Sequence, residues 1–102
     1  MTEAPRLPDG TVVARAADAV GNREMDLRGG LENGTLSVLV NCRGKGRLTV
    51  HVQPVGLSFP LACVDGEVRS TYNRLKLKRP RGHGTVSVTV PSTVRWALTV
   101  GR

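Results

Sequence analysis

Residues 34–53 read GTLSVLVNCRGKGRLTVHVQ, and this stretch decides the fold class. Every second residue of its first half is apolar, and its second half repeats the pattern: Leu36, Val38 and Val40, then Leu48, Val50 and Val52. Such alternation is typical of strands with one buried face. Between the halves, Gly44-Lys45-Gly46 has the glycines of a tight turn. The stretch therefore predicts two strands joined by a hairpin turn.

The same alternation continues through the rest of the chain. Its further apolar positions are Leu57, Phe59 and Leu61; Leu75 and Leu77; Val86, Val88 and Val90; and Val94, Trp96, Leu98 and Val100. Turn residues separate the runs at Asn33-Gly34, Asp65-Gly66, Gly82-His83-Gly84 and Pro91-Ser92. Asn33-Gly34 is interpreted as a hairpin turn. Earlier in the chain, 24–28 predicts a short strand, whereas 11–19 fits either a strand or a short helix.

Strands that recur about every 10–12 residues are expected of a sandwich or barrel. We therefore predict an all-β fold: a β-sandwich of seven to eight mostly antiparallel strands, immunoglobulin-like or jelly-roll-like. The chain of 102 residues suffices for one domain, which we expect at residues 11–102 after a flexible leader at 1–10. The leader lacks the apolar segment of a signal peptide, and no run of about 18 apolar residues predicts a membrane span.

The formal net charge of +7 is unevenly distributed. Residues 1–32 carry four basic and six acidic side chains, whereas residues 33–102 carry eleven basic and two acidic ones. The densest cationic group lies on a predicted strand and the loop after it: Arg74, Lys76, Lys78, Arg79 and Arg81. A second group, Arg43, Lys45 and Arg47, widens the first if the fold brings the two together.

This charge favours an anionic partner. On a strand, Arg74, Lys76 and Lys78 share one face at intervals of about 7 Å, which suits an anionic polymer, lipid head groups or a protein partner. The alternative is that cations on an edge strand only prevent aggregation. Nucleic acid is less favoured, because single strands bind several exposed aromatic rings and only Tyr72 lies outside the core pattern.

The sequence offers no candidate catalytic residues. Of its two histidines, His51 falls on the polar side of a predicted strand and His83 lies in a glycine-flanked turn. The chain has no G-x-S-x-G motif, and its basic part has only Asp65 and Glu67 as carboxylates. We therefore expect a protein that is not an enzyme and needs no cofactor.

Cys42 and Cys63 continue the apolar parity of two different strands, so both are expected to face the core. Two such cysteines are candidates for a disulfide, which belongs to an oxidising compartment. Two buried free thiols are the alternative. A metal site of Cys42, His51, Cys63 and His83 is disfavoured, because their spacing matches no compact zinc pattern.

Three segments resemble small exported or lipoprotein-like β-sandwich domains of actinobacteria, which are of uncharacterised function. The segments are NCRGKGRLTV at 41–50, PLAC at 60–63 and VTVPSTVRWALTV at 88–100. The resemblance implies an extracytoplasmic location, secreted or associated with the cell surface, and a disulfide between Cys42 and Cys63. It assigns no catalytic residues, and the start of the chain lacks a lipobox cysteine. The expected function is a non-catalytic binding module for an anionic cell-envelope partner, with a nucleic-acid-binding β-domain as the alternative.

Overall fold

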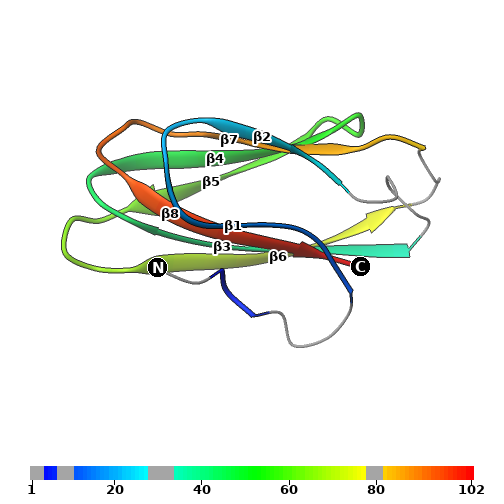
Figure 1. Ribbon diagram of the computed structural model, residues 1–102, viewed down its shortest axis with the longest axis horizontal. Helices are drawn as coiled ribbons and strands as arrows, with labels where there is room; N and C mark the ends of the chain where they lie inside the picture. Colours follow the sequence, from blue (N-terminus) through cyan, green and yellow to red (C-terminus); the bar gives the residue numbers. More distant parts are fainter. Residues whose placement is uncertain (1–3, 7–10, 28–33, 78–81) are drawn as a thin grey trace.

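The structure is a computed structural model that describes residues 4–6, 11–27, 34–77 and 82–102. Every regular element in these residues is a β-strand (Figure 1). The strands are β1 (Val12–Val20), β2 (Arg23–Asp26), β3 (Gly34–Arg43), β4 (Gly46–Gln53), β5 (Leu57–Cys63), β6 (Arg69–Leu77), β7 (Thr85–Thr89) and β8 (Arg95–Gly101). The same residues contain no helix long and apolar enough to cross a membrane. The predicted all-β class is confirmed, and the segment that fitted either a strand or a helix is strand β1.

The strands form two antiparallel four-stranded sheets with the topology of a jelly roll. Sheet A has the order β1-β8-β3-β6, and sheet B has the order β2-β7-β4-β5. The first strand pairs with the last, the second with the seventh, the third with the sixth and the fourth with the fifth. These pairs lie alternately in sheet A and sheet B, as if one long hairpin were rolled up. Of the two arrangements that the sequence allowed, immunoglobulin-like and jelly-roll-like, the strand order is that of the jelly roll.

The glycine turn Gly44-Lys45-Gly46, which the sequence predicted as a hairpin, connects the two sheets instead. β3 lies in sheet A and β4 in sheet B, so Gly44-Lys45-Gly46 carries the chain from one layer to the other. β2 and β3 also lie in different sheets, so they form no hairpin at Asn33-Gly34; Asn33 itself lies outside the described residues. Turn chemistry permits a sharp reversal of the chain but does not make the flanking strands pair.

The core lies between the sheets and consists of aliphatic side chains around one tryptophan. The inward apolar side chains of β3, β4 and β8 have no exposed surface: Leu36, Val38, Val40, Cys42, Leu48, Val50, Val52, Trp96, Leu98 and Val100. Trp96 is the register partner of Cys42, and its indole N–H donates a hydrogen bond of 3.0 Å to the carbonyl of Gly21. The inward parity predicted for these strands is therefore confirmed.

Four connections lie together at one end of the sandwich, on the left in Figure 1. They are the links β1–β2, β3–β4, β5–β6 and β7–β8. The backbone N–H of Gly44 donates to the carbonyl of Val64 at 3.0 Å, and the hydroxyl of Thr93 donates to the carbonyl of Lys45 at 2.8 Å. These hydrogen bonds tie the β3–β4 turn to the two connections beside it.

Candidate binding surface

β6 presents the described part of the predicted cationic group on the outer face of sheet A. Arg74 and Lys76 are exposed, whereas Leu75 between them is half-buried and Leu77 is 6% exposed. β6 pairs with β3 along its whole length, and this register holds the two cations on the outer side. The predicted alternation of outward cations and inward leucines is confirmed for these four residues. The remaining members, Lys78, Arg79 and Arg81, lie outside the described residues.

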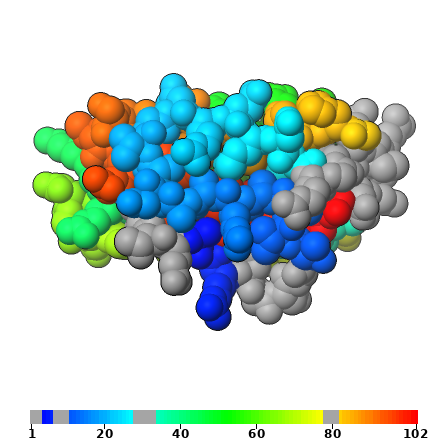
Figure 2. Space-filling view, in the orientation of Figure 1, coloured from blue at the N-terminus to red at the C-terminus, as the bar shows by residue number. Residues whose placement is uncertain are grey.

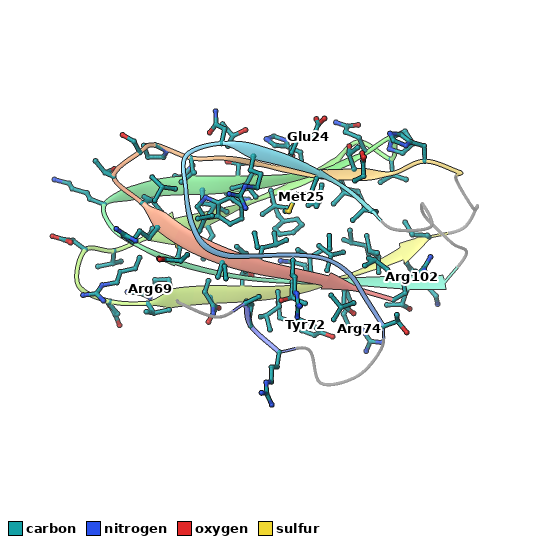
Figure 3. The ribbon with its side chains drawn as sticks, viewed as in Figure 1. Glu24, Met25, Arg69, Tyr72, Arg74 and Arg102 are labelled. Carbon is teal, nitrogen blue, oxygen red and sulfur yellow. A yellow bond between two sulfur atoms is a disulfide. The ribbon has the colours of Figure 1, made fainter. Side chains whose placement is uncertain are left out.

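Tyr72 adds an aromatic ring to the same face. Its side chain is 42% exposed, and its hydroxyl donates a hydrogen bond of 3.3 Å to Oγ of Ser37 on β3. Figure 3 shows Tyr72 and Arg74 pointing away from the core on the same side of β6. The sequence correctly singled out Tyr72 as the exposed aromatic residue, because Trp96 is fully buried and Phe59 is half-buried.

The second predicted cationic group does not adjoin the first. Arg43 lies on the outer face of sheet A, but its register places it about 20 Å from Arg74 along the strands. Lys45 lies in the turn between the sheets, and Arg47 faces outward from sheet B. Among the described members of both groups, only Arg74 and Lys76 are neighbours on one face.

The outward charges of the strands are segregated by sheet. On sheet A they are Arg15, Asp18, Arg43, Arg74, Lys76 and Arg95. On sheet B they are Glu24, Asp26 and Arg47. Glu24 and Arg74 point to opposite sides of the sandwich in Figure 3. Sheet A therefore has a cationic outer face, whereas that of sheet B carries a slight acidic excess.

Some cations of this region are already paired with carboxylates. Arg95 Nη1 lies 2.9 Å from Asp18 Oδ1, and Arg69 Nη2 lies 3.4 Å from Glu67 Oε2. Within the described ranges, Arg74 and Lys76 form no ion pair. Their charges are therefore the ones that an anion approaching β6 would meet first.

Part of the outer face of sheet A is covered by the chain itself. The hydroxyl of Thr99 donates to the carbonyl of Pro5, and Thr99 is only 2% exposed although its position faces outward. Ala97 on the same side of β8 has no exposed surface. The sequence predicts a flexible leader at residues 1–10 and does not indicate this contact of Pro5. The available signal was the run of small or apolar residues in β8, which is typical of a strand buried on both faces.

Cys42 and Cys63 form a disulfide, as predicted, with a Cα–Cα distance of 5.7 Å. It joins the end of β3 in sheet A to the end of β5 in sheet B, beside Trp96. Both sulfur atoms are used, so neither buried thiols nor thiolate ligands for a metal are present at these positions. The described part of the chain has no group of three or more His, Cys, Asp and Glu side chains placed to hold a metal ion.

His51 lies on the outer face of sheet B in a row of polar side chains. Its register partners are Ser58 on β5 and Ser87 on β7, and Ser87 in turn pairs with Glu24 on β2. A nucleophile–base–acid series needs the acid beside the histidine. Here Glu24 is next to the serine, so the order of the row differs from that of a catalytic triad.

A groove of about 660 Å³ lies between β1 and β2. Its described lining is Val12, Val13, Ala14, Arg15, Met25 and Asp26. Figure 2 shows this side of the sandwich, with β1 in blue against β2 in cyan. β1 and β2 are the edge strands on one side of the two sheets, and β6 and β5 are the edge strands on the other. The groove therefore lies at the edge of the sandwich remote from Arg74 and Lys76.

Compared with known proteins, the chain matches no family model, no curated protein and no solved structure at a significant level.

Proposed function

We propose that this protein is a non-catalytic binding module that takes an anionic partner of the cell envelope at the outer face of sheet A. The observation that carries the proposal is the segregation of charge, because the outward strand charges of sheet A are mostly basic and those of sheet B are not. A charge surplus needed only for solubility has no reason to gather on one sheet.

The contact region is the β6 side of that face. Arg74 and Lys76 are exposed, unpaired among the described residues and adjacent, and Tyr72 lies beside them. The β8 side is covered where Pro5 contacts Thr99, so an extended anionic ligand meets β6 first.

We place the protein outside the cytoplasm. The disulfide between Cys42 and Cys63 supports this location, because disulfides persist in oxidising compartments and are rare in the cytosol. The resemblance of residues 41–50 and 88–100 to exported β-sandwich domains points to the same compartment.

Charge reversal on the two faces tests the function. We expect the double variant Arg74→Glu, Lys76→Glu to bind heparin, used as a soluble polyanion, about tenfold or more weakly than the native protein. Binding by the native protein should also weaken as salt is raised, since the contacts are exposed. Affinity chromatography and calorimetry at two salt concentrations measure both effects.

Arg47→Glu is the matched control, because it reverses the same kind of charge on the outer face of sheet B. It should leave heparin binding nearly unchanged. A loss of binding free energy for Arg47→Glu about half that of the double variant would match its half as large change in net charge, and would mean that net charge, and not the β6 face, binds the polyanion. A single-stranded oligonucleotide bound more tightly than heparin would favour the nucleic-acid alternative instead.

A further inference from the structure

β6 is the most regular of the four edge strands described. Its nine register pairs with β3 run from Gly34–Leu77 to Cys42–Arg69 without a shift. β1 has two register shifts, and Asp18 there adopts a φ of +49°. β2 is only four residues long, and β5 contains Pro60. Bulges, short length and proline are the usual devices that stop an edge from pairing with another strand. β6 has none of these three, and its protection against other strands is the charge of Arg74 and Lys76, which an acidic strand would neutralise.

Part of the core is accessible on the side where β6 and β5 end the two sheets. β5 and β6 contact each other across the sandwich. Leu57 of β5 is 39% exposed, while Phe59 and Leu61, which face inward, are only half-buried. Among the described residues, apolar surface therefore remains accessible beside the edge of β6 that pairs with no other strand.

We propose that β6 takes an acidic polypeptide segment as an added strand of sheet A. This inference rests on the proposed function and specifies the partner of the same face. The backbone N–H and C=O groups on the free side of β6 would pair with the segment, as in other cases of strand addition. Alternate side chains of the added strand would lie beside Arg74 and Lys76 on one face and beside the half-buried Leu75 on the other.

The charge of β6 selects the partner. Arg69–Leu77 contains three basic residues and no acidic residue. Like charges placed opposite each other on paired strands are destabilising, whereas opposite charges contribute about 0.2–1 kcal/mol per pair. β6 of a second copy is equally basic and is therefore disfavoured. A segment with carboxylates at every second position pairs its charges with Arg74 and Lys76 on the outer face.

The inward positions of the added strand should be apolar. The strand would extend sheet A past β6, so its inward side chains would approach Phe59 and Leu61 of β5. The predicted partner thus alternates acidic and aliphatic residues. A flexible polyanion without this alternation satisfies the cations but leaves the apolar surface and the backbone groups unpaired.

Two blocked heptapeptides of the same composition test strand addition. The first alternates Glu and Val, starting and ending with Glu, and the second has its four Glu before its three Val. We expect the alternating peptide to bind about tenfold or more tightly than the block peptide, because only alternation puts charge on one face and apolar side chains on the other. Hydrogen exchange should show slower exchange for backbone amides of Arg69–Leu77 when the alternating peptide is bound.

Charge exchange provides the second measurement. The variant Arg74→Glu, Lys76→Glu should bind the alternating Glu peptide about tenfold or more weakly and should gain binding of an alternating Lys and Val peptide. Arg47→Glu should bind both peptides as the native protein does. Circular dichroism of each variant confirms that the sandwich is retained.

The outcomes separate this inference from the function on which it rests. Equal binding of the alternating and block peptides overturns strand addition and leaves an electrostatic face. Heparin binding without peptide binding overturns the acidic polypeptide as the partner. Slower exchange of backbone amides at β1, β2 or β5, and not at β6, overturns the choice of β6 as the site. Dimerisation of the free protein through β6 overturns the acidic segment as its occupant. Absence of both heparin and peptide binding by the native protein overturns the proposed function as well.

Discussion

Gly44 lies in the β3–β4 link, where the backbone comes very close to the β7–β8 link at Thr93 and Val94. Its φ is +122°, which L side chains rarely adopt, and a Cβ atom there would overlap the carbonyl oxygen of Thr93. That oxygen belongs to the backbone of the β7–β8 link and cannot swing aside as a flexible side chain does. Glycine is therefore required at position 44 for two reasons: the positive φ, and the lack of space for a Cβ atom.

We expect Gly44→Ala to lower the free energy of unfolding by about 3 kcal/mol, of which about 1 kcal/mol comes from the positive φ and the rest from the overlap. Gly66→Ala is the control, because Gly66 also has a positive φ, +79°, but no heavy atom lies within 4 Å of its Cβ position. It should cost only about 1 kcal/mol. Urea unfolding followed by tryptophan fluorescence measures both; equal losses would show that contact with Thr93 is unimportant.

The alternation of apolar and polar residues predicted the orientation of almost every strand side chain. It predicted the degree of burial less well at the edges of the sheets. Val50 and Trp96 have no exposed surface, as their parity predicted, whereas Leu57 shares the predicted core parity of its strand and is 39% exposed. Parity gives the side of the sheet to which a residue points. It does not say whether the strand lies at the centre or the edge of that sheet, and Leu57 begins an edge strand.

At the scale of elements, the disulfide joins two strands that no backbone ladder connects. Cys42 is the penultimate residue of β3 in sheet A, and Cys63 is the last residue of β5 in sheet B. The cross-link therefore holds the two layers together at the end of the sandwich where the four connections meet.

Reduction of this disulfide should lower the free energy of unfolding by about 3 kcal/mol, because the cross-link closes a loop of about 22 residues in the unfolded chain. The measurement is urea unfolding with and without a reductant. The double variant Cys42→Ala, Cys63→Ala should be about as unstable as the reduced protein and insensitive to reductant. A native protein whose unfolding midpoint is unchanged by complete reduction, verified by intact mass, would contradict the expectation.

The turns show why element boundaries were easier to predict than element partners. Gly44-Lys45-Gly46 ends one strand and begins the next, as expected, yet those strands lie in different sheets. Glycines allow the backbone to turn sharply, and this signal is the same for a hairpin and for a sheet-to-sheet link. Only the packing of β3 against β6 and β8 distinguishes the two.

At the scale of the whole molecule, nearly every strand pair is remote in sequence. β1 pairs with β8 and β2 with β7, while β4 and β5 are the only consecutive strands that pair among those described. Such contacts require long loops to close before they stabilise the fold. The rolled arrangement therefore forms cooperatively from distant parts of the chain.

We expect refolding on a scale of about milliseconds to seconds, as is usual for all-β folds rich in remote contacts. Trp96 is the only tryptophan and is fully buried, so its fluorescence reports on formation of the core in stopped-flow experiments. The time course should agree with that of far-ultraviolet circular dichroism if folding is two-state. Refolding complete within microseconds would contradict this expectation.

The candidate surface was predictable in part. The run Arg74-Leu75-Lys76-Leu77 determines that cations and leucines occupy opposite sides of a strand, because side chains alternate with a period of two. Its position at an edge, its distance from Arg43 and the placement of Arg47 on the other sheet depend on which strands become neighbours. No local pattern contains that information.

By itself, the sequence determined the strands, the side to which most side chains point, the inward cysteines and the excess of basic residues after residue 33, since each depends on nearest neighbours along the chain. The tertiary structure alone decided the jelly-roll order, the cross-layer disulfide, the cover of Pro5 over Thr99 and the free, regular edge at β6. The physical reason is that these features arise from pairing between strands far apart in the sequence, and the energy of burying both apolar faces together selects among the pairings that local preferences allow.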